Sequence, residues 1–219
     1  MSRLRIIKIC GITDPGLAAE TVRLGAHYIG IIMYEHSKRY VNVLQAKYIA
    51  AAVKDAGGIP VAVFVDTPPH EIKSICKICD IDTVQLHGSI SRKGHQYLPE
   101  SFQRIYVMHV NDDGSLNPDA DHGLNYLDKK RDFILFDGVK GGSGQFVNWN
   151  NFTYDGMFHY LVAGGLTPEN VSSVISLLHP SGVDVSSGVE QTPGVKDKHL
   201  IKQFIDSAKQ STKHVVCNT

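Results

Sequence analysis

"HYLVAGGLTPENVSSVISLLHPSGVDV" occupies residues 159–185 and contains one complete strand–helix–strand unit. The apolar run 159–163 ends at a double glycine, a helical pattern covers 168–178, and a second apolar run covers 182–185. A connection that passes through a helix joins parallel strands, because antiparallel neighbours need only a short turn. The stretch therefore predicts a parallel sheet with helices packed on it.

The same alternation continues through the whole chain. Short apolar runs that end near Gly, Asp, His or Ser predict strands at 5–10, 27–33, 60–65, 82–86, 104–109, 132–137, 159–163 and 182–185. Helical patterns lie between them, near 15–24, 43–56, 69–79, 91–98, 118–128, 148–153, 168–178 and 197–209. Eight strands alternating with helices predict an α/β fold, a single-domain (βα)8 TIM barrel over residues 1–210. We expect residues 211–219 to form a frayed C-terminal tail.

Charge and composition exclude several classes of protein. The 22 Lys and Arg residues equal the 22 Asp and Glu residues, so the chain lacks the basic surplus of a nucleic-acid-binding protein. Neither a membrane-spanning run nor the apolar core of a signal peptide is present, so we expect a cytoplasmic protein. Cys76 and Cys79 form a CxxC pair without a second pair or a nearby His, and we interpret them as packing residues rather than a metal site.

A barrel places its active site at the carboxyl ends of the strands and in the loops that follow them. The strand ends supply these candidates: Cys10, Asp66, His87, His109, Asp137 and Ser186. The loops after strands seven and eight are the usual phosphate site of such a barrel.

Both of these loops have the composition of a phosphate site. Gly164 and Gly165 would let a ligand approach the backbone, while Thr167 suits a helix N-cap and Pro168 the first helical position. A second small-residue turn follows strand eight directly. The predicted phosphate-binding residues of the two turns are Gly164, Gly165, Ser186, Ser187 and Gly188. The alternative is that each loop is an ordinary strand-to-helix turn.

Asp137 closes an apolar strand, and a glycine-rich loop follows it. A carboxyl group that such a loop covers has its pKa raised by desolvation and can donate a proton. The predicted mobile cover consists of Gly141, Gly142, Ser143 and Gly144. The alternative is a strand end and a turn with no chemistry.

Cys10 closes the first strand and shares its inward face with Lys8. A buried ammonium group needs a carboxylate partner, and Asp184 on the neighbouring eighth strand is the candidate. Cys10 is either a small buried hydrophobic residue or a thiolate base, because a cationic neighbour lowers a thiol pKa. Both interpretations remain open on spacing alone.

The chain resembles the phosphoribosylanthranilate isomerases of tryptophan biosynthesis. The matching motifs run in order from end to end: "KICGIT" (8–13), "SKRY" (37–40), "VFVD" (63–66), "VQLHG" (84–88), "LFDG" (135–138), "GGSG" (141–144), "AGGLTPENV" (163–171) and "GVDVSSGVEQTPGVKD" (182–197). Each motif is weak alone, but their order and spacing cover essentially the whole chain.

The resemblance implies a (βα)8 barrel and a cofactor-free Amadori rearrangement of N-(5-phosphoribosyl)anthranilate. It also implies Asp137 as the general acid, Cys10 as the general base and Arg39 as the residue that binds the anthranilate carboxylate. His87 and Asp184 match residues that line the substrate pocket, and the turns around Gly164–Gly165 and Ser186–Gly188 match the phosphate site. We expect a monomer or a homodimer that binds its phosphosugar-anthranilate substrate and neither nucleic acid nor a membrane.

Two places depart from the family pattern. "VNW" (147–149) stands where an F-D-W triplet is common, and His109 stands where we expect a lysine or arginine. The alternatives are another phosphosugar isomerase or epimerase barrel and a non-catalytic barrel that binds a phosphate ligand. The former would need metal-binding or aspartate residues at strand ends where this chain has other residues, and the latter predicts loss of the acid or the base.

Overall fold

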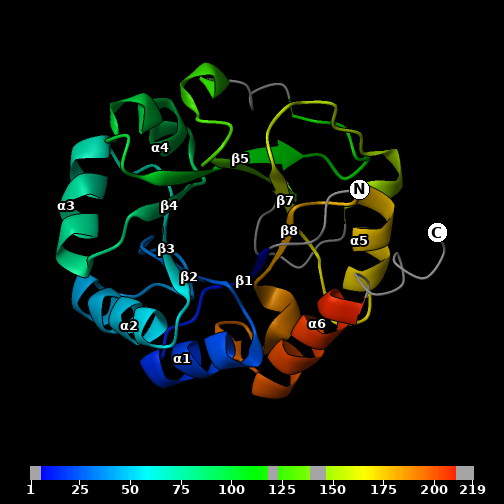
Figure 1. The fold of residues 1–219 in the computed structure, drawn as a ribbon, viewed down its shortest axis with the longest axis horizontal. Coiled ribbons are helices and arrows are strands. Elements are labelled where there is room, and N and C mark those ends of the chain that lie inside the picture. The colour runs from blue at the N-terminus through cyan, green and yellow to red at the C-terminus, as the bar shows by residue number, and fades with distance from the viewer. Residues whose placement is uncertain (1–5, 118–122, 139–146, 211–219) are drawn as a thin grey trace.

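The computed structural model describes residues 6–117, 123–138 and 147–210. Its eight parallel strands close into one barrel in sequence order, with β1 paired to β8. The strands are β1 (Ile6–Cys10), β2 (Tyr28–Ile32), β3 (Ile59–Phe64), β4 (Thr83–Leu86), β5 (Gln103–Val110), β6 (Phe133–Gly138), β7 (Tyr160–Val162) and β8 (Gly182–Val185). Figure 1 shows helices arranged around the ring of strands. The predicted (βα)8 barrel is confirmed.

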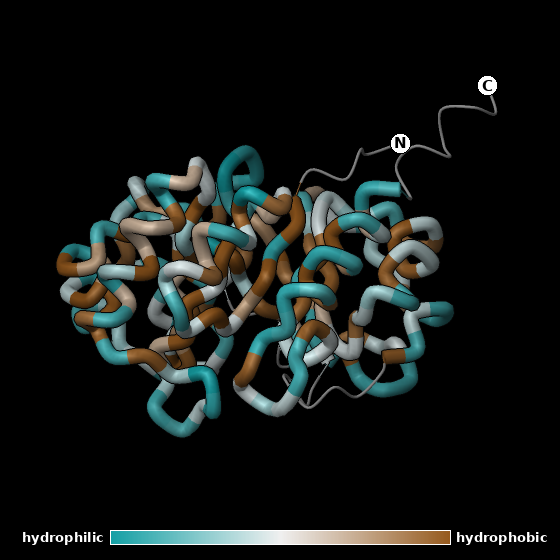
Figure 2. The backbone as a smooth tube through the Cα atoms, turned by 90° about the horizontal axis from the view of Figure 1, so that it is seen from below, coloured by the Kyte–Doolittle hydropathy of each residue, from teal (hydrophilic) through white to brown (hydrophobic). Residues whose placement is uncertain are grey.

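Six α-helices are found within the described ranges. They are α1 (Pro15–Leu24), α2 (Val43–Asp55), α3 (Pro69–Cys79), α4 (Ser89–Gly94), α5 (Val171–Leu178) and α6 (Lys198–Gln210). In α1 and α2 the N-cap side chain accepts a hydrogen bond three residues on, Asp14 from Leu17 N–H at 2.7 Å and Asn42 from Gln45 N–H at 2.9 Å. Hydrophobic and hydrophilic segments alternate along the backbone in Figure 2, as expected for helices with one buried face.

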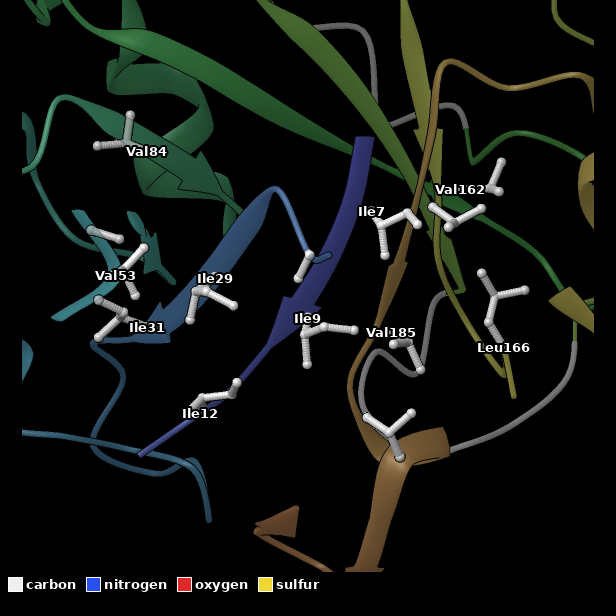
Figure 3. Packing of buried hydrophobic residues seen from close by; sticks show 14 of the residues in the cluster. Ile7, Ile9, Ile12, Ile29, Ile31, Val53, Val84, Val162, Leu166 and Val185 are labelled. Carbon is white, nitrogen blue, oxygen red and sulfur yellow. The ribbon is translucent and has the colours of Figure 1, made fainter. Parts of the chain in front are cut away.

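Alternation along each strand separates two cores. Ile7 and Ile9 of β1 point away from the barrel axis and pack with residues such as Ile29 of β2 between the strands and the helices (Figure 3). A smaller apolar cluster, which includes Ile6, fills the inside of the barrel at its amino-terminal end. Because neighbouring residues face opposite sides, Lys8 and Cys10 share the inner face with Ile6. The interior apolar cluster therefore forms a floor beneath the polar residues at the carboxyl end.

Within the described residues, single turns of 3-10 helix stand where two helices were expected. The described part of 118–128 contains η3 (Leu124–Tyr126), which begins after Gly123 at a φ of 96°, a left-handed backbone conformation that interrupts an α-helix. The described residues at 148–153 contain η4 (Trp149–Asn151). Trp149 and Phe152 are both buried there, with ring centroids 5.3 Å apart. A 3-10 turn places residues three apart on the same side, so it buries both rings.

Smaller differences occur at two other helices. The expected helix 91–98 divides into α4 and η1 (His95–Tyr97). The regular part of α5 begins only at Val171, but Thr167 caps the turn that leads into it, as expected: its hydroxyl accepts a hydrogen bond from Glu169 N–H at 3.3 Å and its carbonyl accepts one from Val171 N–H at 3.1 Å. The Asn170 carboxamide accepts a hydrogen bond from Thr167 N–H and donates one to the Gly165 carbonyl, both at 2.8 Å. Asn170 thus folds back over the turn and, together with Thr167, caps it.

A short hairpin follows β8 and was not predicted. After the single turn η5 (Ser187–Val189), β9 (Glu190–Thr192) and β10 (Val195–Lys196) pair antiparallel outside the barrel. Gly194 lies in the turn between them at a φ of 93°. None of the described helices has the length and apolar character needed to span a membrane. The expected tail, 211–219, lies outside the described residues.

Candidate active site

A cavity of about 390 Å³ opens at the carboxyl ends of the strands. Residues from the strands and from the loops after them line it, including Cys10, Arg39, His87, Asp137, Asp184 and the turns 164–166 and 185–187. The structure therefore brings together side chains that lie up to 177 positions apart in the sequence, as Cys10 and Ser187 do. Its position agrees with the general location of active sites in this fold.

Lys8 and Asp184 form an ion pair beneath Cys10. Lys8 Nζ lies 2.8 Å from Asp184 Oδ2, and the two side chains are 0% and 7% exposed. The two residues are register partners in the β1–β8 ladder, so the backbone pairing places them side by side. The predicted pairing is confirmed. Burial lowers the pKa of Lys8, but the charge of Asp184, the hydrogen bond to it and the neighbouring Cys10 together outweigh burial, so the pKa is raised and the ammonium group stays protonated.

Cys10 lies above this ion pair at the end of β1. Its register partner on β2 is Gly30, where an added Cβ would lie 2.6 Å from Cys10 Sγ. Burial raises the pKa of the Cys10 thiol, and Lys8 and Lys196 oppose this only in part. Lys8 does lower the thiol pKa, as a cationic neighbour should, but desolvation is the larger effect and the net shift is upward. Cys10 is a neutral thiol at rest.

Asp137 faces the same cavity from β6 and is 8% exposed. Burial, with a further contribution from the charge of Asp184, raises the pKa of Asp137 to about 7. The carboxyl group is thus able to hold a proton near neutral pH, which a general acid requires. Gly164 packs against it, at a φ of 89°: an added Cβ would lie 3.2 Å from Asp137 Oδ1 and 2.9 Å from Gly138 N. Only glycine fits this position without displacing the acid.

Arg39 lines the cavity from the loop after β2, but one edge of its guanidinium group is already engaged. Nε donates to Glu190 Oε1 at 2.6 Å and Nη2 donates to Glu190 Oε2 at 2.8 Å. Neither Glu190 nor this contact was predicted. A guanidinium group has five N–H donors, so the edge that carries Nη1 remains for a second planar anion.

His87 lies at the carboxyl end of β4 beside His109 of β5, with ring centroids 5.0 Å apart. Burial lowers the pKa of His87 to about 3, and the neighbouring His109 and Arg92 add to the effect. His87 is therefore a neutral imidazole that can give or take one hydrogen bond. His109 and Asp66, two other candidates from strand ends, do not line the cavity. The Asp66 carboxylate instead accepts a hydrogen bond from Ile90 N–H at 3.0 Å.

The two turns proposed for phosphate lie next to each other. Gly164, Gly165, Ser186 and Ser187 line the cavity, whereas Gly188 does not. An added Cβ on Gly188 would lie 1.9 Å from the Leu166 carbonyl oxygen, so only a residue without a side chain lets the two turns pack this closely. The Ser186 hydroxyl donates to the Cys10 carbonyl at 3.0 Å and does not point freely into the cavity.

Two buried acceptors at the cavity complete the polar set. Among the described residues, neither Gln85 Oε1 nor Asp184 Oδ1 has a hydrogen-bond partner, and both residues are no more than 5% exposed. Both line the cavity, and a buried unsatisfied acceptor is costly unless a ligand supplies a donor. Gln85 was not predicted, although it lies two residues before His87 and so shares the inner face of β4.

The remaining expectations concern the glycine-rich cover, metal binding and the CxxC pair. The cover Gly141, Gly142, Ser143 and Gly144 lies outside the described residues. Within the described ranges, no three His, Cys, Asp or Glu side chains come together as a metal site. Cys76 and Cys79 are buried on α3, away from the cavity residues.

An acid and a thiol facing one cavity at the mouth of a (βα)8 barrel, next to two glycine- and serine-rich turns, define a barrel enzyme for acid–base chemistry on a phosphorylated substrate. The family model "N-(5'phosphoribosyl)anthranilate (PRA) isomerase" matches residues 7–207. The chain belongs to this family of isomerases.

Individual relatives match this chain over almost its full length. The N-(5'-phosphoribosyl)anthranilate isomerase of Chlamydia caviae is 38% identical over 210 residues, which cover 95% of this chain and 99% of the relative. A crystal structure of phosphoribosyl anthranilate isomerase from Thermotoga maritima is 35% identical and superimposes with a TM-score of 0.81 over 96% of this chain and 100% of that chain. A second solved structure of such an isomerase, in complex with reduced 1-(o-carboxyphenylamino)-1-deoxyribulose 5-phosphate, has 34% identity and a TM-score of 0.75, with the same coverage of both chains.

Proposed function

We propose that the chain converts N-(5-phosphoribosyl)anthranilate to 1-(2-carboxyphenylamino)-1-deoxyribulose 5-phosphate in tryptophan biosynthesis, with Asp137 as the general acid and Cys10 as the general base. The observation that carries the proposal is the raised pKa of Asp137, about 7, in a cavity that Cys10 also lines. Family membership supports the substrate. The reaction needs one proton donor and one proton acceptor and no oxidant or reductant.

Asp137 begins the reaction by donating its proton to the ring oxygen of the ribose. The lone pair of the anthranilate nitrogen forms a C=N bond as the bond from C1 to the ring oxygen breaks, which gives a protonated Schiff base and an Asp137 carboxylate. A carboxyl group with an ordinary pKa would be ionised at neutral pH and have no proton to give. Burial raises the pKa of Asp137 to about 7, so the carboxyl group keeps a proton to donate.

Cys10 then removes the proton from C2 of the sugar. The positive Schiff base makes this C–H bond acidic, and the electron pair moves to form an enolamine, which tautomerises to the aminoketose. A thiolate whose pKa is raised is a stronger base than an ordinary thiolate, although less of it is present. Lys8 favours the thiolate electrostatically from the layer below.

The cavity offers a place for each charged or polar part of the substrate. The free edge of Arg39 suits the anthranilate carboxylate, and apolar Ile32 and Val63 line the same cavity as a surface for the aromatic ring. The turns at Gly164–Gly165 and Ser186–Ser187 suit the phosphate through backbone N–H groups. The unsatisfied acceptors of Gln85 and Asp184 suit the hydroxyl groups of the opened sugar, and neutral His87 can bond to a hydroxyl as either donor or acceptor.

We further propose that the enzyme works in the cytoplasm, without a cofactor, as a monomer or a homodimer. A cytoplasmic setting accords with the free Cys10 that the proposed base requires, because that compartment keeps thiols reduced.

The direct test is a turnover assay with purified chain and N-(5-phosphoribosyl)anthranilate, in which loss of substrate fluorescence follows the reaction. We expect saturable turnover at neutral pH in the presence of a chelator. The absence of turnover in folded protein, with product that still binds, would favour a non-catalytic barrel that recognises the phosphate ligand.

A further inference from the structure

The hairpin β9–β10 contributes two charged side chains to the edge of the cavity. Glu190 holds Arg39 with both carboxylate oxygens, and the two side chains are 4% and 11% exposed. Glu190 also accepts hydrogen bonds from Gly194 N–H at 3.1 Å and from Lys196 Nζ at 2.7 Å. Burial raises the pKa of Glu190, but the hydrogen bonds from Arg39 and Lys196 outweigh it and lower the pKa to about 2. The carboxylate stays ionised.

Lys196 is the second of these side chains, and its contacts lead to Cys10. Its Nζ donates to the Ser186 carbonyl at 2.9 Å, to Ser186 Oγ at 3.1 Å and to Glu190 Oε1, so all three ammonium protons have acceptors. The Lys196 side chain is 2% exposed. Ser186 Oγ in turn donates to the Cys10 carbonyl at 3.0 Å. One unbroken chain of hydrogen bonds therefore links Arg39 to the backbone of Cys10.

We propose that Glu190 and Lys196 are positioning residues of the isomerase site, with Glu190 fixing the orientation of Arg39 and Lys196 holding the Ser186 turn against Cys10. This inference rests on the roles proposed above for Arg39 and Cys10. It assigns a task to a hairpin that lies outside the barrel.

Glu190 determines which edge of Arg39 is free. With Nε and Nη2 turned to Glu190, the edge that carries Nη1 is the one left for a substrate carboxylate. The aliphatic part of Arg39 is fixed as well, because it packs on Gly11, where an added Cβ would lie 2.5 Å from Arg39 Cδ. A guanidinium group fixed at both ends loses little conformational freedom when substrate binds. Glu190 should therefore act on substrate affinity.

Lys196 acts on the other end of the chain of contacts. Its positive charge favours the thiolate of Cys10, and its two bonds to Ser186 fix the turn that also lines the proposed phosphate site. One excess positive charge remains on the buried cluster formed by Arg39, Lys196 and Glu190. That charge suits a substrate with both a carboxylate and a phosphate.

The alternative is that the cluster only stabilises the fold. An ion network of this burial loses stability when one member is removed, whether or not it serves catalysis. Melting temperature alone therefore does not separate the two explanations. Measurements that a structural role would leave unchanged are needed at both ends of the chain of contacts.

At the Arg39 end, the variant is Glu190→Gln, which keeps the shape but removes the charge. We expect the KM to rise about 10-fold or more, with kcat changed far less, because a hydrogen bond to a charged group is lost from the residue that orients Arg39. Glu190→Asp, which keeps the charge, should restore part of the affinity. The double variant with Arg39→Ala should have the KM of Arg39→Ala alone, since Glu190 acts through that residue. Additive effects of the two substitutions would overturn this part of the proposal.

At the Cys10 end, the variant is Lys196→Met, measured without substrate. Alkylation of Cys10 by iodoacetamide, followed by mass spectrometry of its peptide at a series of pH values, reports the thiol pKa directly. We expect the midpoint to move to higher pH in Lys196→Met and to return toward the wild-type value in Lys196→Arg. Lys202→Met, at an exposed lysine paired with Asp206, is the matched control and should leave the midpoint unchanged.

An unchanged Cys10 midpoint in folded Lys196→Met would refute the role of Lys196. If Lys196→Met does not fold, Lys196→Arg and Lys196→Gln provide the same comparison of charge. The alkylation measurement needs no turnover, so it remains decisive even if the wild-type chain fails to isomerise N-(5-phosphoribosyl)anthranilate. That second failure would refute the proposed function separately.

Discussion

Lys8 Nζ lies 2.8 Å from Asp184 Oδ2 inside the barrel, in a layer that solvent hardly reaches. The pair separates the apolar floor of the barrel from the acid and the thiol above it. Its negative member raises the pKa of Asp137, and its positive member favours the thiolate of Cys10. One ion pair thus influences both proposed catalytic groups in the direction each one needs.

Lys8→Met should destabilise the protein strongly, because it leaves the buried charge of Asp184 without a partner. Loss of one member of a buried pair costs about 3–5 kcal/mol. The measurement is the free energy of unfolding by chemical denaturation, with Lys54→Met as the control. Lys54 pairs with Asp80 at the surface, where side-chain exposures are 39% and 90%, and its loss should change little. Equal effects of the two substitutions would show that the buried pair is not a structural element.

Asp137→Asn should stabilise the protein at alkaline pH. The folded pKa of Asp137 is about 7 and its ordinary value is 3.8, so between these values the folded state binds more protons than the unfolded state. Stability is therefore lost as the pH rises from about 4 to about 7, by an amount on the order of 4 kcal/mol. Asparagine does not ionise and avoids this cost. Melting curves should show the variant above wild type at alkaline pH and close to it near pH 4; no pH dependence of the difference would contradict the raised pKa.

The pH dependence of kcat/KM should reflect an unusual order of the two pKa values. The acid has the lower pKa, about 7, and the thiol pKa is raised above its usual value. The reactive combination, a protonated Asp137 with a Cys10 thiolate, is therefore a minority that grows with pH up to about 7 and is then constant until Cys10 ionises. Above that point activity should fall. An acidic limb that ends near pH 4, the ordinary range of a carboxyl group, would contradict the assignment.

Arg39→Ala should act on substrate binding. Its free guanidinium edge is the proposed partner of the anthranilate carboxylate, so its removal should raise the KM by about 10-fold or more while kcat changes less. Arg39→Lys should restore little of the affinity, because a lysine cannot bond to Glu190 and to the substrate with two parallel edges. Steady-state kinetics with both variants makes the test. A KM equal to that of wild type would remove Arg39 from the site.

The sequence predicted the barrel well because each β-strand carries its own local pattern. The expected strand 104–109 became Gln103–Val110, and the pairing of Lys8 with Asp184 followed from alternation and from closure between β1 and β8. The helix predictions were wrong where the segment was short and polar or contained a left-handed glycine, as at Gly123. Tertiary packing rather than local propensity determines the conformation of such segments.

The parts of the site that were missed depend on contacts between distant segments. Arg39 and Glu190 are 151 residues apart, and nothing local in either segment indicates that they meet. The direction of the Cys10 pKa shift stayed open because the sequence shows the charge of Lys8 but not how deeply the thiol is buried. Gln85 could have been found by extending the inner face of β4 back from His87.

The most direct test of the account compares Asp137→Asn and Cys10→Ser in turnover, product affinity and melting temperature. Asparagine cannot transfer the proton, and a serine hydroxyl is a far weaker base than a thiolate. General acid–base contributions are typically about 10²- to 10⁴-fold, so turnover should fall by this factor in each variant while product still binds. If either variant keeps more than about a tenth of wild-type turnover, below the lower end of that range, its assignment as the acid or the base is wrong.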